Sequence, residues 1–288
     1  MPSDSLQLDN QDFKAGRMIL GFAGWMDGGD VSTGAAEWLI EQRGYEPIAE
    51  INPDEFFLMN FPGSMEVTAM FRPHAQVEAG MIKTYEPPSN TVYWSEADDL
   101  LVLMGNEPHM RWQAFADCLW QIMEQAGTRE LYFAGSVAGV VPHTRDPRMR
   151  CSVSDESLKP RLEKLGMRFV DYEGPASFPT HLMHEAPDYG VQMTSLVTEI
   201  PAYIQGRNPK GIEAILRQFG TLMDLSFDLE SLRDLGDHWE KRINEAVDER
   251  QDLAEHIRKL EEDYDHEVFD TQMGDLKDWL EQQGIQVD

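Results

Sequence analysis

The stretch Tyr132-Phe-Ala-Gly-Ser-Val-Ala-Gly-Val-Val-Pro-His-Thr-Arg145 decides the fold, because an apolar run passes into small residues and then into a polar turn. This pattern predicts a buried strand that opens into a loop at the carboxyl edge of a parallel α/β sheet, where ligands bind. Two simpler interpretations stay open, since the glycines can serve close packing alone and a loop histidine or arginine is often only solvated or ion-paired. The candidate crevice residues in this stretch are Gly135, Ser136, His143, Thr144 and Arg145.

Two further segments repeat the order of strand, polar turn and helix. Arg17–Phe22 reads as a buried strand and Val31–Gln42 as a helix, while Leu100–Met104 and Trp112–Gln125 form a second such pair. Strands that alternate with helices predict an α/β fold with a mainly parallel, doubly wound sheet. The other expected elements are strands at Pro47–Ile51, Glu55–Met59, Glu66–Arg72, Thr91–Trp94, Arg168–Tyr172 and Val191–Val197, and a helix at Leu158–Leu165.

The turns after these strands supply the remaining candidates, because the carboxyl ends of parallel strands meet at one edge. The first turn matches neither the G-x-G-x-x-G nor the G-x-x-x-x-G-K-[ST] pattern, so its nucleotide signal is weak. Each carboxylate also fits a helix cap or a loop hydrogen bond. The candidates are Trp25, Asp27, Gly28 and Gly29 in the first turn, Gly105, Glu107 and Pro108 in the second, and Glu173 and Gly174 after Arg168–Tyr172.

Composition limits the class of protein. The chain has 288 residues, 41% of them hydrophobic, which suits one substantial core with a smaller appended unit. No window approaches about 18 uninterrupted apolar residues, so we expect a cytoplasmic protein without a membrane span. The two cysteines, Cys118 and Cys151, lack metal-ligand spacing, and neither a disulfide nor a metal site is predicted.

The charge argues against two kinds of partner. With 24 basic and 52 acidic residues, the chain carries a formal charge of −28, which repels phosphate backbones and anionic membrane surfaces. We therefore expect no nucleic-acid or membrane partner. Such an acidic surface also suits a salt-rich cytoplasm, and the sequence leaves open whether the host is halophilic.

The C-terminal quarter differs from the rest of the chain. Residues 224–288 contain 21 acidic and seven basic residues. A seam at alternating steps of four and three, which Gly236 and Arg250 interrupt, runs through Leu232, Gly236, Trp239, Ile243, Ala246, Arg250, Leu253, Ile257, Leu260 and Tyr264. This spacing predicts an antiparallel helical hairpin or a coiled coil, and its seam suggests self-association. The acidic residues fit either a solvated helix face or a partner surface. The expected organisation is a tail over 1–16, an α/β domain over 17–223 and an acidic helical extension over 224–288.

Six short motifs carry a resemblance to a known family. They are Gly24-Trp-Met-Asp-Gly-Gly29, Gly105-Asn-Glu-Pro108, Gly135-Ser136 with Val141-Pro-His-Thr-Arg145, Tyr172-Glu-Gly-Pro175, Ile200-Pro201 and Asn208-Pro-Lys210. In this order and spacing, over most of residues 17–223, the chain resembles the proteasome assembly chaperone 2 family, particularly its bacterial branch. That branch has also been labelled an ATP-grasp-type enzyme or carboxylate-amine ligase.

The resemblance implies a fold similar to that of purine nucleoside phosphorylases, a three-layer α/β/α sandwich, with a helical C-terminal extension. It also implies a non-catalytic role, since eukaryotic relatives hold proteasome α-subunits during ring assembly. Family members that dock on proteasomes often end in a hydrophobic residue, tyrosine and any residue. This sequence ends in Gln286-Val287-Asp288, which argues against direct proteasome docking.

Two classes of function remain. The residues contain no catalytic triad or complete phosphate loop, so we expect a protein-binding, assembly or scaffolding protein that forms homo-oligomers, with no catalytic residue and no cofactor assigned. The alternative is a nucleosidase- or phosphorylase-like enzyme, with Asp27, Glu107 or Glu173 as general base, His143 as proton donor and Arg145 holding an anionic ligand. An ATP-dependent ligase is less favoured, because Lys83 and Lys210 do not lie in strand contexts suited to ATP.

Overall fold

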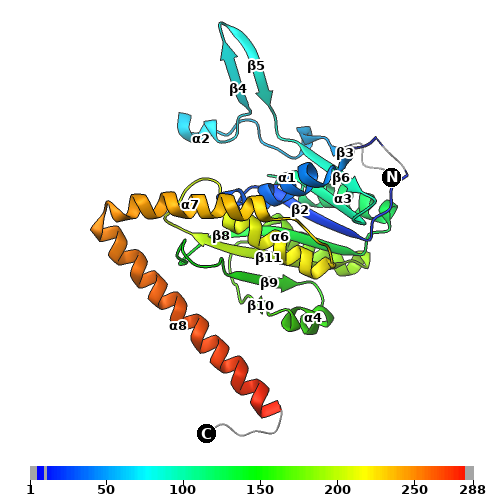
Figure 1. The fold of residues 1–288 in the computed structure, drawn as a ribbon. Helices are drawn as coiled ribbons and strands as arrows, with labels where there is room; N and C mark the ends of the chain where they lie inside the picture. Colours follow the sequence, from blue (N-terminus) through cyan, green and yellow to red (C-terminus); the bar gives the residue numbers. More distant parts are fainter. Residues whose placement is uncertain (1–4, 10–11, 283–288) are drawn as a thin grey trace.

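A nine-stranded mixed sheet forms the centre of the computed structural model, which describes residues 5–9 and 12–282 (Figure 1). The strand order is β1-β3-β6-β7-β2-β8-β11-β9-β10, so the chain crosses over repeatedly between neighbouring strands. The strands are β1 (Leu6–Leu8), β2 (Arg17–Ala23), β3 (Glu46–Ile51), β6 (Asn90–Ser95), β7 (Leu100–Asn106), β8 (Glu130–Gly139), β9 (Met149–Val153), β10 (Arg168–Phe169) and β11 (Gln192–Pro201).

The central strands β7, β2, β8 and β11 are parallel to one another, as the buried apolar runs predict. The sheet becomes antiparallel on both sides of this group, where β6 pairs with β7 and β9 pairs with β11. The sheet is therefore mixed, and its parallel part is the part that positions the candidate turns. β10 pairs with β9 in parallel and so runs opposite to β8.

Helices cover both faces of the sheet. Met18, Leu20 and Phe22 of β2 enter one hydrophobic cluster while Ile19 enters the other, because successive strand residues point to opposite faces. The first cluster is completed by α3 and α5, and the second by α1 and α6. This arrangement is an α/β sandwich; its similarity to purine nucleoside phosphorylases stays a prediction. The helices are α1 (Val31–Arg43), α3 (Trp112–Ala126), α4 (Lys159–Lys164), α5 (Phe178–Glu185) and α6 (Pro209–Met223).

Two strand predictions are wrong in the segment between β3 and β6. Glu55–Met59 begins with the last residue of a short 3-10 turn over Pro53–Glu55 and forms no strand. Glu66–Arg72 instead overlaps α2 (Met65–Ala69), which Ser64 caps by accepting a hydrogen bond from Val67 N. A serine followed by a short helix is a normal N-cap arrangement, and it outweighs the local strand propensity.

A separate two-stranded hairpin follows α2 and projects from the body (Figure 1). Its strands are β4 (His74–Glu78) and β5 (Met81–Glu86), joined by Ala79 and Gly80, which both have positive φ values of 49° and 79°. Positive φ at both central residues is typical of the tight turns that join antiparallel strands. Every residue of β4 and β5 is exposed.

The C-terminal part is helical, as predicted. α7 (Glu230–Asp248) packs against α6, and α8 (Gln251–Gln282) leaves α7 at an angle so that the two form a V (Figure 1). Of the predicted seam, Leu232, Ile257 and Leu260 are buried within the chain, whereas Ala246 and Arg250 are exposed. No helix within residues 5–9 and 12–282 is long and apolar enough to cross a membrane. The Gln286-Val287-Asp288 ending lies outside the described residues.

Candidate functional site

The turn after β2 is fastened to the end of β8. Ser136 N donates a hydrogen bond to Met26 O at 2.8 Å, and Ser136 Oγ donates to Gly28 O at 2.6 Å. Asp27 and Ser136 also form an isolated parallel bridge. The motifs around Gly28 and Ser136, which are more than 100 residues apart in the sequence, therefore meet at the carboxyl edge.

Asp27 binds the first turn of helix α1. Its carboxylate accepts hydrogen bonds from Ser32 N at 2.8 Å, Thr33 N at 3.1 Å and Thr33 Oγ1 at 2.7 Å. Burial raises the pKa of Asp27 to about 6, although the bonds from Thr33 and Ser32 act in the opposite direction. The N–H groups that could hold an anion at this helix start are thus bound to Asp27 itself.

The two glycines beside Asp27 allow close packing. A Cβ on Gly29, whose φ is +64°, would lie 2.8 Å from Asn208 Cβ, and a Cβ on Gly28 would lie 3.1 Å from Ile200 Cδ1. Asn208 N also donates a hydrogen bond to Gly29 O at 2.8 Å. These contacts join the turn to the start of α6, so packing accounts for both glycines.

Glu107 connects the turn after β2 with helix α5. Its carboxylate accepts a hydrogen bond from Phe178 N at 2.7 Å and another from Trp25 N at 3.2 Å. Gly105 is equally constrained, because a Cβ there would lie 2.1 Å from Asn90 Oδ1. Next to Glu107, Pro108 O accepts a hydrogen bond from Trp112 Nε1 at 2.8 Å. The second turn thus holds the edge of the sheet together.

His143 is buried between the body and α7. Its Nδ1 lies 2.8 Å from Tyr203 Oη, and its Nε2 lies 3.1 Å from Asn244 Oδ1. Burial lowers the pKa of His143, and the contact with Asn244 acts against that shift. Lys210 Nζ donates to His143 O at 2.9 Å and to Glu240 at 2.6 Å, which adds a second link to α7.

Arg145 binds α8. Its Nε and Nη2 each donate a hydrogen bond of 2.8 Å to Asp265, and its Nη1 lies 3.5 Å from Glu261, which also accepts a hydrogen bond from Thr144. The hydrogen bond to Asp265 raises the pKa of Arg145 further and lowers that of the Asp265 carboxyl.

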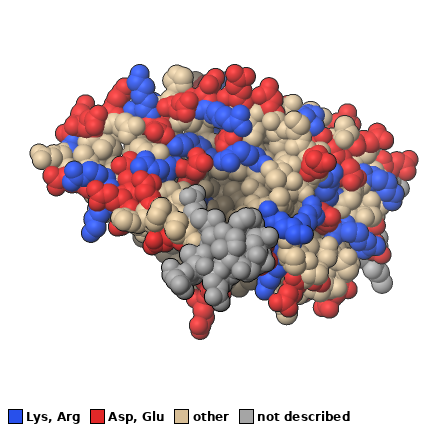
Figure 2. Space-filling model, turned by 60° about the horizontal axis from the view of Figure 1, so that its bottom comes forward, with Lys and Arg blue, Asp and Glu red and all other residues tan. Residues whose placement is uncertain are grey.

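The contact continues along α8 to residues that the sequence motifs did not include. Arg148 lies 4.5 Å above the ring of Tyr264 and 2.8 Å from Glu267, while Arg150 lies 3.5 Å from Glu267. Tyr264 Oη donates to Asp146 O at 2.9 Å. In Figure 2, Lys and Arg side chains gather around a hollow near the centre of the face shown. Asp and Glu side chains are prominent toward the outer edge of that face. Within this acidic chain, basic side chains hold the acidic helix.

Glu173 and Gly174 lie apart from these contacts. Both are exposed, and Tyr172 Oη donates to Pro175 O at 3.0 Å within the same loop. The expectation that they follow a strand parallel to the others is wrong, because β10 runs opposite to β8. Only the end of this loop lies near the carboxyl edge of the parallel strands, where Ala176 and Trp25 line the same cleft.

The structure divides the predicted crevice into separate parts. Trp25, Glu107 and Pro108 line a cleft of about 740 Å³ between the body and the base of the hairpin, together with Phe71 and Trp112. His143 and Arg145 instead line a space of about 10 Å³ that Trp239 of α7 helps to close. The first three residues therefore face a volume that can admit a ligand, and the other two face packed protein.

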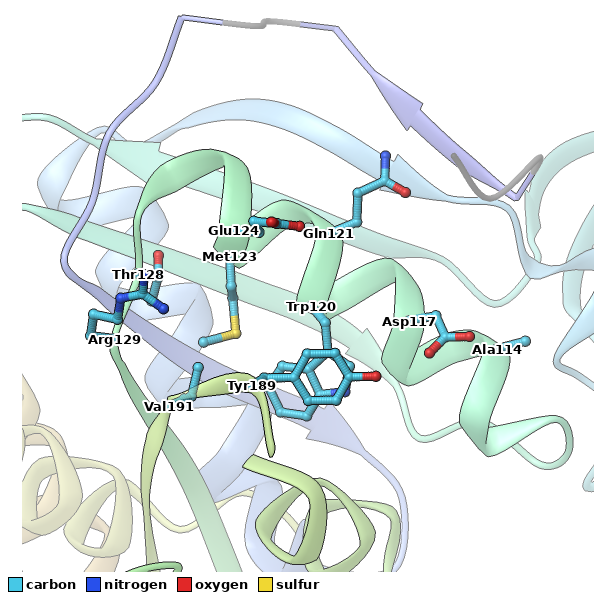
Figure 3. A pocket seen from close by; sticks show the side chains of 10 residues that line it. All are labelled: Ala114, Asp117, Trp120, Gln121, Met123, Glu124, Thr128, Arg129, Tyr189 and Val191. Atoms are coloured by element: carbon cyan, nitrogen blue, oxygen red, sulfur yellow. The ribbon is translucent and has the colours of Figure 1, made fainter. Parts of the chain in front are cut away.

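A larger hollow of about 960 Å³ lies along the outer side of α3, away from all the predicted residues (Figure 3). Trp120 and Tyr189 stack at its floor with ring centroids 4.7 Å apart, and Arg129 lies toward one end. Among the described residues, no group of three or more His, Cys, Asp or Glu could hold a metal ion. Cys118 and Cys151 are buried thiols, and Cys118 Sγ donates a hydrogen bond to Ala114 O at 3.3 Å. Burial raises the pKa of Cys151 to about 11.

Comparisons with solved structures show the same fold. A Mycobacterium tuberculosis protein of unknown function has 20% identity and a TM-score of 0.81, with 96% of this chain and 93% of that chain covered. A proteasome-assembly chaperone homologue of the same organism has 23% identity and a TM-score of 0.71, covering 84% and 99%. An archaeal proteasome activator from Pyrococcus furiosus has 19% identity and a TM-score of 0.61, covering 85% and 99%.

The family follows from a match in sequence. No curated protein sequence matches the chain. The model of the PAC2 family matches residues 21–247, which include the turns after β2, β7 and β8 and most of α7. The family match and the three structures above give no support to the ATP-grasp label. Since the match spans more than half of the sequence, the chain belongs to the PAC2 family.

Proposed function

We propose that this protein is a non-catalytic assembly or scaffolding factor that binds protein in the cytoplasm and associates with itself. The observation that carries the proposal is the use of the His143–Arg145 loop, the most distinctive motif of the sequence, to hold α7 and α8. Membership of the PAC2 family supports it, as do relatives described as a proteasome-assembly chaperone homologue and a proteasome activator.

The contacts of the candidate bases argue in the same direction. A general base must have its carboxylate within reach of a substrate proton. Asp27 and Glu107 both use their carboxylates to accept hydrogen bonds from backbone N–H groups that start α1 and α5. His143 is enclosed between Tyr203 and Asn244. These five contacts explain the three residues as structural supports, without a reaction.

A metabolite-wide thermal-shift screen that includes nucleosides and ATP with Mg²⁺ tests the proposal, followed by turnover assays on every compound that binds. We expect no compound to be consumed. The informative variant is Glu173→Gln, because Glu173 is exposed and its replacement leaves the packed edge intact. A compound that wild type consumes, and that both Glu173→Gln and His143→Ala spare, would establish an enzyme instead.

A further inference from the structure

The stretch from His143 to Arg150 is a local exception to the acidity of the chain. It contains Arg145, Arg148 and Arg150 against one aspartate, a net charge of +2 within a chain of −28. The three arginine side chains, which we call the arginine row, are 34%, 18% and 31% exposed. In so acidic a protein, this row is a place where negatively charged groups are attracted rather than repelled.

The part of α8 that covers the row carries the opposite charge. Residues 261–267 contain five carboxylates and neither lysine nor arginine. Asp265 and Glu261 meet the first arginine of the row, and Glu267 meets the other two. The ring of Tyr264 lies against the middle one, with its centroid 4.5 Å from Arg148 Cζ. These contacts are ionic or cation–π, so α8 binds the row through charge.

The contacts between α8 and the row are individually weak. The side chains of Asp265 and Glu267 are 55% and 51% exposed, and ion pairs that water reaches contribute little to stability. The buried apolar residues of α8, Ile257 and Leu260, both lie before the acidic part. The acidic part is therefore held by contacts that the carboxylates of another segment can replace.

The joint between α7 and α8 is suited to a change of angle between the two helices. It consists of Glu249 and Arg250, both of them exposed. Hinges are commonly a few residues at the end of an element that absorb a change of backbone angles. On the other side of the joint, Asn244 of α7 is bound to His143. A change of angle here moves α8 away from the row and leaves α7 in place.

One donor of the row stays unused while α8 covers it. Arg148 Nε is buried and has no hydrogen-bond acceptor among the described residues. The other two nitrogens of this side chain face carboxylates, since Nη2 lies 2.8 Å from Glu267 and Nη1 lies 4.0 Å from Glu199. A buried polar group without a partner is unfavourable. A segment that brings a carboxylate to Arg148 Nε gains a hydrogen bond that α8 does not make.

We propose that the arginine row is a docking surface for an acidic segment of a partner protein, and that α8 covers this surface until such a segment displaces it. The inference rests on the proposed function, protein binding, and names the surface and the chemistry of the partner. The segment needs carboxylates on both sides of an aromatic residue, as α8 has in Glu261, Tyr264, Asp265 and Glu267.

The covalent link between α8 and the body sets how the two occupants compete. A segment joined to its site by the chain has an effective concentration on the order of millimolar. An outside segment with the same contacts is therefore excluded from most wild-type molecules. It gains access when the contacts of α8 are weakened.

The test uses a fluorescent synthetic peptide with the sequence of residues 257–270 and follows its binding to the full chain by anisotropy, at about 0.15 M salt to screen long-range repulsion. The released variant combines Glu261→Gln, Asp265→Asn and Glu267→Gln. We expect it to bind the peptide at least about tenfold more tightly than wild type, and its α8 to exchange amide hydrogens faster. Adding Arg148→Gln and Arg150→Gln should abolish the gain in binding.

Two controls separate the row from a general effect of charge. The combination of Glu262→Gln, Asp263→Asn and Asp270→Asn removes three carboxylates of α8 that are also exposed, and it should bind the peptide as wild type does. A peptide with the same residues in scrambled order keeps the charge and loses the placement of the tyrosine between carboxylates. It should bind the released variant less tightly than the native order does.

Four results would overturn the inference. They are equal binding to wild type and the released variant, unchanged exchange in α8, equal binding of the native and scrambled peptides, and binding that survives Arg148→Gln with Arg150→Gln. A mass by light scattering that falls from wild type to the released variant would also overturn it, because α8 of a second copy would then be the occupant. None of these results bears on turnover, so a failure here is distinct from a failure of the non-catalytic proposal.

Discussion

Replacing Asp27 by asparagine should change how stability depends on pH. Asparagine keeps an oxygen that can accept the hydrogen bonds from Ser32 N and Thr33 N, so the N–H groups in the first turn of α1 keep their acceptor. What the replacement removes is a titrating carboxyl. In the folded protein burial raises its pKa to about 6, against an ordinary value of 3.8.

The size and sign of the effect follow from these two values. Between pH 4 and 6 the folded protein retains a proton on Asp27 that the unfolded chain has lost, so protonation stabilises the fold there. The free energy of unfolding therefore decreases as the pH rises through this range and levels off above about 6. A shift of about 2 units corresponds to about 3 kcal/mol.

The assay is urea denaturation of wild type and Asp27→Asn at pH values from 4 to 7.5. The difference between the two proteins cancels the contributions of the other titrating groups. Asp30→Asn is the matched control, because it removes an exposed carboxylate three residues away and leaves the contacts of Asp27 in place. Parallel curves for wild type and Asp27→Asn, or a wild type that gains stability relative to the variant as the pH rises, would refute the reasoning.

Three further replacements test other contacts. Arg145→Ala should loosen α8 without unfolding the sheet, so hydrogen exchange should quicken around Glu261, and high salt should do the same to wild type. Glu107→Ala removes the acceptor of Phe178 N and should lower the free energy of unfolding by about 1–3 kcal/mol in urea. Asp98→Asn should cost about 3 kcal/mol by the same assay, because the 3% exposed Asp98 side chain holds Arg43 and Tyr45. Unchanged exchange or unchanged midpoints would contradict these expectations.

The parallel core could be predicted because its strands are buried on both faces. The runs Met18–Phe22 and Leu100–Met104 contain no polar side chain, and the helix after the second run, α3, carries a clear apolar stripe. The β4–β5 hairpin gave a weaker signal, because no core imposes regular alternation on an exposed hairpin. Its Ala79-Gly80 turn was the one local clue, since glycine there accommodates the positive φ that such a turn requires.

The candidate residues were found more readily than their partners. Parallel strand direction is enough to bring the turns near Asp27, Glu107 and His143 to one edge. The contacts of His143 with α7 and of Arg145 with α8 involve residues 101 and 120 positions further along the chain, in helices whose docking leaves no local pattern. The sequence therefore indicated a crevice, whereas α7 and α8 occupy the part of the edge beside His143.

His143 is either a proton donor or a residue that docks α7, and the titration of its own side chain distinguishes the two roles most directly. The titration is monitored by NMR of the imidazole, and the variant His143→Gln assigns the signal. Burial between Tyr203 and Asn244 should place its pKa below 6.5, so that the ring is neutral at pH 7, and nucleosides or ATP with Mg²⁺ should leave the signal unchanged. A pKa near or above 7, together with a shift on adding one of these compounds, would show a proton donor at a ligand site and contradict the structural role.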